Sequence, residues 1–162
     1  MKLYVYDHCP FCVRAQGRWS HRPASLRRRA KLQSHSVDRA LERCGERALV
    51  IPRTPDPVYP EFRTQAAREY FRKKKEAAFG PFDALLAATE ELKGQLTTGL
   101  TELVSLLPDA ENHASINDVL LFPILRSLSI VPELTLPSPI KIYRDRMSER
   151  ADISLIAPSR PI

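Results

Sequence analysis

Leucines recur at helical spacing through the middle of the chain, and this feature limits most strongly what the chain can fold into. Six of them fall at intervals of seven, four, four, three and four residues: Leu85, Leu92, Leu96, Leu100, Leu103 and Leu107. An α-helix turns once in about 3.6 residues, so this spacing forms one apolar stripe on a helical face. We interpret the stripe as part of a helical core and expect Gly94 and Gly99 to bend or break the helix.

Two helices are predicted before the stripe. Apolar residues around position 50 suit a helix that stops before Pro52, because a residue that precedes proline disfavours the helical conformation. The prolines of residues 52–60 predict an extended loop. The second helix is expected over residues 64–79 with Thr64 as its N-cap. Its charged residues are interpreted as a solvated face: Glu69, Lys73, Lys74, Lys75 and Glu76.

Two more helices are predicted after the stripe. Residues 115–118 are similar to a capping box, in which Ser115 caps the helix and Asp118 reaches back to it. Pro123 lies inside that helix, so we expect a kink there. The last helix is expected over residues 138–150, followed by an apolar tail that lies back on the helices. One face of this last helix is predicted to carry Ile142, Tyr143 and Met147.

The N-terminal segment has a different texture. Residues 2–6, Lys-Leu-Tyr-Val-Tyr, are rich in β-formers and predict a single strand. A short helix is expected from Phe11 to about Trp19, with Pro10 near its first turn. Residues 20–36 show neither strand nor helix periodicity, so we assign no regular structure to them. The chain is therefore predicted to be mainly α.

The basic charge is concentrated in one short stretch. The net charge is +6, and seven basic residues without an acid lie between Arg14 and Lys31, so the remainder sums to −1 (6 − 7). A nucleic-acid-binding domain would carry basic residues across a whole face. We interpret the stretch as a solvated basic arm. The alternative is a nucleic-acid contact, although Trp19 would be its sole stacking aromatic.

Length and composition exclude several classes of protein. The 162 residues suffice for one domain or two small ones. The hydrophobic share of 43% and the charged share of 27% are near the globular average, which argues against wholesale disorder. No apolar run reaches the about 18 residues of a transmembrane helix, and Asp7 comes too early for a signal peptide. We therefore expect a cytoplasmic protein, in which three cysteines do not form a disulfide framework.

The motif Cys9-Pro10-Phe11-Cys12 carries the chemistry of the chain. It follows the predicted strand and opens a helix, where unpaired backbone N–H groups favour a thiolate. Cys9 would attack a disulfide, and Cys12 would resolve the mixed disulfide. Two alternatives remain, half of a zinc site or inert thiols, but Cys44 and the histidines lack the spacing of further ligands. Tyr6 either lines a substrate groove or packs under the helix.

Several segments resemble the bacterial glutaredoxin 2 family. Residues 1–12, MKLYVYDHCPFC, look like the opening of the family, and the resemblance resumes from about residue 40 to 162. The downstream matches are specific enough to name the family, whereas a lone CPFC is not. They are EFRTQAAREYF (61–71), KKEA (74–77), SINDVLLFPILR (115–126) and YRDRM (143–147).

This resemblance implies a glutathione-transferase-like layout, a thioredoxin-like domain followed by a helical one. It also implies glutathione-dependent reduction of protein or small-molecule disulfides, with glutathione as cosubstrate and no metal. Carried over by position, Cys9 is the nucleophile and Cys12 the resolving thiol. Tyr6, Pro10 and Phe11 would lie on the glutathione side. Phe11 replaces the family's usual tyrosine and lacks its hydroxyl.

The chain is short for that layout. A thioredoxin-like domain needs roughly 70–80 residues, whereas the helical part begins roughly 25–30 residues after Cys12. The family's Val-Pro segment, which carries the cis-proline, finds no match, because its one candidate, residues 50–52, fits the first helix of the helical domain better. The family's Glu-Ser loop, which holds the glutathione carboxylate, also finds no match. We therefore predict a thioredoxin-like remnant (1–15), a basic irregular segment (16–36) and the helical glutaredoxin 2 domain (37–162).

Two functions follow from these features. By family, the chain is a glutathione-dependent thiol–disulfide oxidoreductase, and loss of the cis-proline segment should sharply lower its selectivity for glutathione. The alternative is a catalytically inactive helical interaction module, or the product of a defective gene. Residues 16–36 have the composition of an out-of-frame segment, so a deletion or frame error is our hypothesis. An intact reading frame across many isolates would count against it.

Overall fold

A computed structural model describes residues 45–105, 107 and 116–158, and every element within them is helical. This confirms the mainly α prediction. The predicted strand, the short helix after Cys12 and the basic stretch lie outside the described residues. In chain order the elements are α3 (Glu46–Val50), η2 (Ile51–Arg53), η3 (Pro60–Phe62), α4 (Gln65–Phe79), α5 (Phe82–Ala87), α6 (Thr89–Val104), α7 (Ile116–Ser127), η4 (Leu128–Ile130) and α8 (Ser138–Ala151), where η denotes a 3₁₀ turn.

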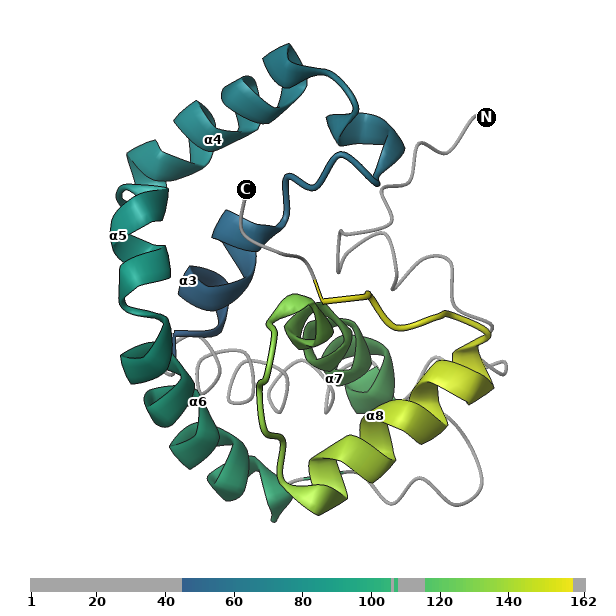
Figure 1. Cartoon of the computed structure of the whole chain (residues 1–162). Helices are drawn as coiled ribbons and strands as arrows, with labels where there is room; N and C mark the ends of the chain where they lie inside the picture. The colour runs from purple at the N-terminus through teal and green to yellow at the C-terminus, as the bar shows by residue number, and fades with distance from the viewer. Residues whose placement is uncertain (1–44, 106, 108–115, 159–162) are drawn as a thin grey trace.

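Helix α7 lies at the centre of the helical body. Helices α4, α5 and α6 follow one another in an arc, with α3 on its inner side and α8 beside α7 (Figure 1). Helix α3 packs against α6, and α7 packs against α8. Phe122 and Leu125 of α7 are completely buried between these helices. Within the described part of the chain, no helix is both long and apolar enough to cross a membrane.

The leucine stripe forms one wall of the core, as predicted. Leu96, Leu100 and Leu103 are buried, and the partly buried Leu92 and Leu107 pack against them. The expected break at a glycine is wrong, because Gly94 and Gly99 lie inside α6 and the break falls at Ala88. Burial of the leucine face offsets the roughly 1 kcal/mol that a glycine costs inside a helix.

The first helix ends before Pro52 as predicted, whereas the extended loop expected over residues 52–60 has a 3₁₀ turn at each end. Helix α3 ends at Val50, but the chain continues through Pro52 as the 3₁₀ turn η2. Proline is tolerated in the first turn of a helix, where its missing N–H is not needed. Gly45 precedes α3 with a φ of +77°, and a Cβ there would lie 2.8 Å from Cδ2 of Leu92. The left-handed conformation therefore favours glycine, and a larger residue would also have to displace the end of the Leu92 side chain.

Helix α8 and the tail that follows it close the body. Ile140, Tyr143, Met147 and Ala151 are buried, but Ile142 is 60% exposed, so its predicted place on one face with Tyr143 and Met147 is wrong. Intervals of three and four residues from Ile140 set the buried face, and position 142 falls outside it. The described tail lies back on the helices as expected. Its anchors are Arg126 Nε to the Ser154 carbonyl at 2.7 Å and the Ile156 amide to Ser129 Oγ at 3.0 Å.

Helix α7 begins at Ile116 and continues through Pro123 to Ser127. The predicted cap, Ser115, lies outside the described residues. Asp118 is 1% exposed and accepts a hydrogen bond of 2.7 Å from the Tyr143 hydroxyl. This buried pair joins the first turn of α7 to the middle of α8.

Candidate functional site

The five site residues predicted from the sequence are Tyr6, Cys9, Pro10, Phe11 and Cys12, and all lie outside the described residues. Their roles therefore stay predictions. Across residues 45–105, 107 and 116–158, no cluster of three or more histidine, cysteine, aspartate or glutamate side chains is arranged to hold a metal ion.

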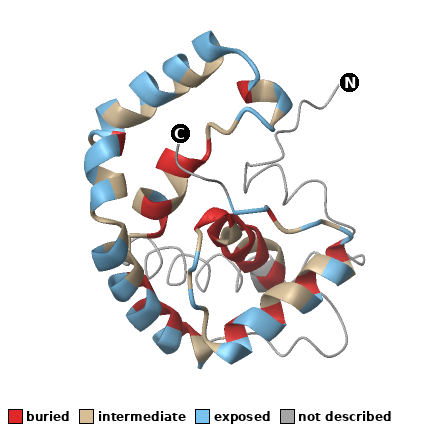
Figure 2. Ribbon diagram, viewed as in Figure 1, coloured by how far each residue is buried: buried red, intermediate tan, exposed pale blue. Residues whose placement is uncertain are grey.

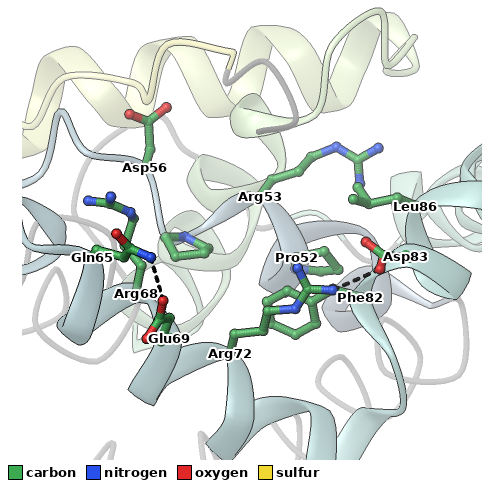
Figure 3. A pocket seen from close by; sticks show the side chains of 11 residues that line it. Pro52, Arg53, Asp56, Gln65, Arg68, Glu69, Arg72, Phe82, Asp83 and Leu86 are labelled. Atoms are coloured by element: carbon green, nitrogen blue, oxygen red, sulfur yellow. Dashed lines mark hydrogen bonds and ion pairs between the residues drawn. The ribbon is translucent and has the colours of Figure 1, made fainter.

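The described part of the chain contains a cavity of about 340 Å³ where η2, α4 and α5 meet (Figure 3). Its walls combine charged side chains with prolines, a phenylalanine and a leucine. They come from three consecutive stretches of the chain: Pro52, Arg53, Pro55 and Asp56; Gln65, Arg68, Glu69 and Arg72; and Phe82, Asp83 and Leu86.

Helix α4 supplies one wall of this cavity. Thr64 caps the helix as predicted, because its hydroxyl accepts from the Ala67 amide at 3.2 Å. The four α4 residues of the wall occupy positions 65, 68, 69 and 72, the spacing of one helical face. No α4 residue is buried, and the helix is exposed or half-buried throughout (Figure 2). Lys73 and Lys74 are exposed as expected.

Phe71 attaches this otherwise exposed helix to the body. Its ring lies edge-on to Phe62, with 5.0 Å between centroids, and to Phe82 at 6.5 Å. The Arg72 guanidinium lies over the Phe82 ring at 5.7 Å from its centroid. Aromatic edge contacts of this kind stabilise beyond the area they bury.

The corner between α4 and α5 is fixed by one carboxylate. Gly80 turns the chain with a φ of +88°. Glu76 Oε1 accepts from the Phe82 amide at 2.8 Å and pairs with Arg72 Nε at 2.9 Å. Arg72 Nη2 also pairs with Asp83 Oδ2 at 2.9 Å. Glu76 thus accepts from a backbone N–H at the start of α5 that has no partner within the helix. Its interpretation as only a residue of a solvated face is therefore wrong.

These contacts shift the pKa values of the corner in opposite directions. The hydrogen bond from the Phe82 amide, assisted by Arg72, lowers the pKa of Glu76. Hydrogen bonds to Glu76 and then Asp83 raise the pKa of Arg72. Both shifts favour the charged forms, so the corner is held by an ion pair at neutral pH.

Replacing Glu76 by glutamine should lower the midpoint of thermal unfolding at neutral pH by a small amount. Because the pKa of Glu76 is lower in the folded chain, its charged form stabilises the fold at pH values above the ordinary pKa of 4.5. This stabilisation is lost as the pH falls below that value. The difference in unfolding midpoint between the parent chain and the Glu76→Gln variant should therefore become smaller at acidic pH. Unfolding scans at neutral and acidic pH measure it, with the exposed Glu91 of α6, changed to glutamine, as the control. A difference that grows in acid would contradict this assignment.

Arg53 belongs to the cavity wall and is held there by buried hydrogen bonds. Its side chain is 5% exposed, with Nη1 donating to the Leu49 carbonyl at 2.7 Å and Nη2 to Thr89 Oγ1 at 2.8 Å. Burial lowers its pKa, and Glu90 opposes that shift. The guanidinium extends toward Leu86, away from Arg72 (Figure 3). Arg53 therefore ties η2 to the start of α6.

Comparison with known proteins adds three findings. The family model for the C-terminal domain of glutaredoxin 2 matches residues 38–158. Glutaredoxin 2 from Escherichia coli K12 is 29% identical over 211 residues, covering 97% of this chain and 98% of the relative. The crystal structure of glutaredoxin 2 from Salmonella typhimurium, in complex with glutathione, matches with a TM-score of 0.75 and 26% identity. That match covers 94% of this chain and 95% of the other.

The alignment with the Escherichia coli protein runs nearly from end to end. It does not support a chain truncated at either terminus. Its 211 positions exceed the 162 residues of this chain by 49, so at least that many positions hold no residue of this chain.

Proposed function

Since the family model matches well over half of its length, the chain belongs to the glutaredoxin 2 family, and we propose that it is a glutathione-dependent thiol–disulfide oxidoreductase. The observation that carries the proposal is the alignment with glutaredoxin 2 across nearly the whole of both proteins. The glutathione bound to the Salmonella relative supports glutathione as the cosubstrate. The reduced glutathione pool of the cytoplasm suits this reaction.

Cys9 would perform the first step. Its thiolate attacks one sulfur of a substrate disulfide, forms a mixed disulfide and releases the other sulfur as a thiolate. Cys12 then attacks the mixed disulfide and releases the second substrate thiol, leaving a Cys9–Cys12 disulfide. Two glutathione molecules reduce that bond and leave as glutathione disulfide. The helix N-terminus predicted after the predicted strand would favour the Cys9 thiolate, and Tyr6, Pro10 and Phe11 would border the glutathione.

We place the unoccupied alignment positions between Cys12 and residue 38, inside the thioredoxin-like domain. The placement is supported by the short interval between Cys12 and residue 38, where the match to the helical family model begins. A thioredoxin-like domain needs roughly 70–80 residues. The proposed parts are then a remnant over 1–15, a basic segment over 16–36 and the helical domain over 37–162. Loss of the cis-proline segment would weaken glutathione selectivity.

A second candidate function is a helical interaction module without turnover. The observation that favours it is the core of the described helices, in which Leu100, Phe122 and Met147 are fully buried. A helical domain with a core of this kind can stay folded even where the redox segment lacks its sheet.

Glutathione-coupled reduction of a small mixed disulfide separates the two candidates. The full-length chain should turn over the mixed disulfide of glutathione and mercaptoethanol, and Cys9→Ser should abolish turnover because no other thiol occupies the nucleophile position. Cys44→Ser is the matched control and should keep the parental rate. A chain that unfolds cooperatively but shows no turnover would refute the enzymatic proposal and support the module.

A further inference from the structure

The charged side chains of α4 are divided between two of its faces. One face follows the helical positions 65, 69, 72 and 76, so both acids of the helix, Glu69 and Glu76, lie on it. Both are engaged, Glu69 by Gln65 and Glu76 by Arg72 and the Phe82 amide. A second face has the same kind of spacing, contains no acid and is exposed throughout. We call it the basic face of α4, and its members are Ala66, Tyr70, Lys73, Lys74 and Ala77.

The basic face has no anionic partner within the described residues. No salt bridge there engages Lys73 or Lys74. The Lys74 ammonium lies over the Tyr70 ring, with 5.9 Å between Nζ and the ring centroid. Tyr70 is 68% exposed, and α4 is exposed or half-buried along its length (Figure 2). The face therefore offers two cations and one aromatic ring to a partner.

Helix α6 presents acids on its exposed side. Glu91 accepts from Gln95 Nε2 at 3.1 Å, and within the described part of the chain no salt bridge engages Glu91 or Glu102. Lys93, the cation of α6, is already paired with Glu90 at 2.9 Å. We call this side the acidic face of α6, and its members are Glu90, Glu91, Gly94, Thr98 and Glu102, all of them exposed.

The middle of the acidic face can be covered at little cost. A Cβ on Gly94 would meet no atom within 4 Å, so the space beside the helix is open there. Thr98 donates its hydroxyl to the Gly94 carbonyl at 3.2 Å, and Thr101 donates to the Thr97 carbonyl at 2.9 Å. Covering these threonines therefore leaves no hydroxyl donor without an acceptor.

The two faces match when the helices run antiparallel. The two adjacent lysines then meet the adjacent acids of residues 90–91. Tyr70 lies one turn before the lysines and Gly94 one turn after those acids, so the ring falls on the open space beside the glycine. Arg63, which is exposed just before α4, then lies at the same end of the helix pair as Glu102. Cations therefore meet acids at both ends of the contact, with the aromatic ring between them.

These two faces do not meet within one copy of the chain. Helices α4 and α6 lie on opposite arms of an arc, with α5 between them (Figure 1). We propose that the basic face of α4 binds the acidic face of α6 of a second copy of this chain. The contact is head to tail, so it can continue from copy to copy. One helix pair buries less than the about 800 Å² per partner of a stable interface, so the dissociation constant should be on the order of hundreds of micromolar.

Sedimentation velocity of the full-length chain tests the proposal, with the cysteines kept reduced so that no disulfide links two copies. The weight-average sedimentation coefficient should rise as the protein concentration increases from micromolar to millimolar. Raising the ionic strength from about 0.05 M to about 0.5 M should suppress this rise, because salt screens exposed charges. Cys9→Ser should associate like the parent chain, so failure of the thiol chemistry stays distinguishable from failure of this contact.

Charge reversal identifies the two faces. Lys73→Glu with Lys74→Glu reverses the basic face, and Glu91→Lys with Glu102→Lys reverses the acidic face. Each pair of substitutions should weaken self-association at least about tenfold, because like charges then meet. An equimolar mixture of the two variants should associate again, because the unchanged face of each variant binds the unchanged face of the other.

Lys141→Glu with Arg146→Glu is the matched control. Both residues are exposed on α8, and the change in net charge equals that of the α4 variant. The control should leave self-association unchanged. Far-ultraviolet circular dichroism checks that each variant is folded. If the α4 variant unfolds, Lys73→Gln with Lys74→Gln takes its place and should weaken self-association about threefold.

Four outcomes would overturn the proposal. The first is a sedimentation coefficient that does not change with concentration. The second is parental self-association of the α4 variant, which would assign the contact to other cations, such as those between Arg14 and Lys31. The third is an equal loss of self-association in the α8 control. The fourth is a mixture of the α4 and α6 variants that stays monomeric.

Discussion

Phe122→Ala is expected to lower the free energy of unfolding by about 3–5 kcal/mol. Phe122 is completely buried in α7, the central helix, and belongs to one cluster with Leu96, Leu100 and Leu125. The substitution loses the transfer free energy of the ring and leaves a cavity that the surrounding helices can fill only in part. Urea denaturation followed by far-ultraviolet circular dichroism measures the loss.

Two companion variants keep the Phe122 result interpretable. Ile142→Ala changes a large apolar side chain that is 60% exposed on α8 and should cost well under half as much. Phe122→Leu keeps most of the volume and should remain folded even if the alanine variant does not. A loss at position 142 as large as that at position 122 would contradict the described core.

Tyr143→Phe is expected to cost about 1.5–3 kcal/mol, the range for hydrogen bonds to charged groups. The hydroxyl donates to Oδ1 of Asp118 at 2.7 Å, and both side chains are buried. Removing the hydroxyl deprives a buried carboxylate of a donor. Tyr70→Phe is the control, because Tyr70 is 68% exposed on α4. Equal effects at the two tyrosines would contradict the buried pair.

The same pair predicts a dependence of stability on alkaline pH. Burial, and then the neighbouring Asp118 charge, raises the pKa of Tyr143 well above its usual value of 10.0. The unfolded chain releases this phenolic proton above about pH 10 while the folded chain retains it, so stability falls as the pH rises. Between these two pKa values, Tyr143 lowers the free energy of unfolding by about 1.4 kcal/mol for each pH unit of increase. Tyr143→Phe should flatten the curve there, as denaturation across alkaline pH will measure.

Local periodicity predicted much of the helical body. The spacing of Leu96, Leu100 and Leu103 gave the buried face of α6, and Thr64 gave the start of α4. The sequence placed the break between α5 and α6 at the wrong residue, because intrinsic helix propensity is lower for Gly94 and Gly99 than for Ala88. Packing decides otherwise, since the leucine face of α6 is buried across both glycines.

The cavity shows where sequence reasoning reaches its limit. The helical spacing of Gln65, Arg68, Glu69 and Arg72 was visible, but it is also the spacing of an ordinary solvated face. Only the fold brings Pro52 and Asp83 opposite that face. The role of Glu76 was hidden for the same reason, because its partner, the Phe82 amide, lies beyond the turn at Gly80.

Helix α4 has no buried residue, and this has a kinetic consequence. Its attachment to the body rests on a few contacts, chiefly those of Phe71 and of the corner formed by Arg72 and Glu76. Opening α4 therefore exposes little apolar surface and costs less free energy than global unfolding. Its amide protons should exchange with solvent through local opening, while those of α7 wait for the whole body to unfold. Among the described helices, a protease would reach α4 first, and a nick there would leave the core of α6, α7 and α8 assembled.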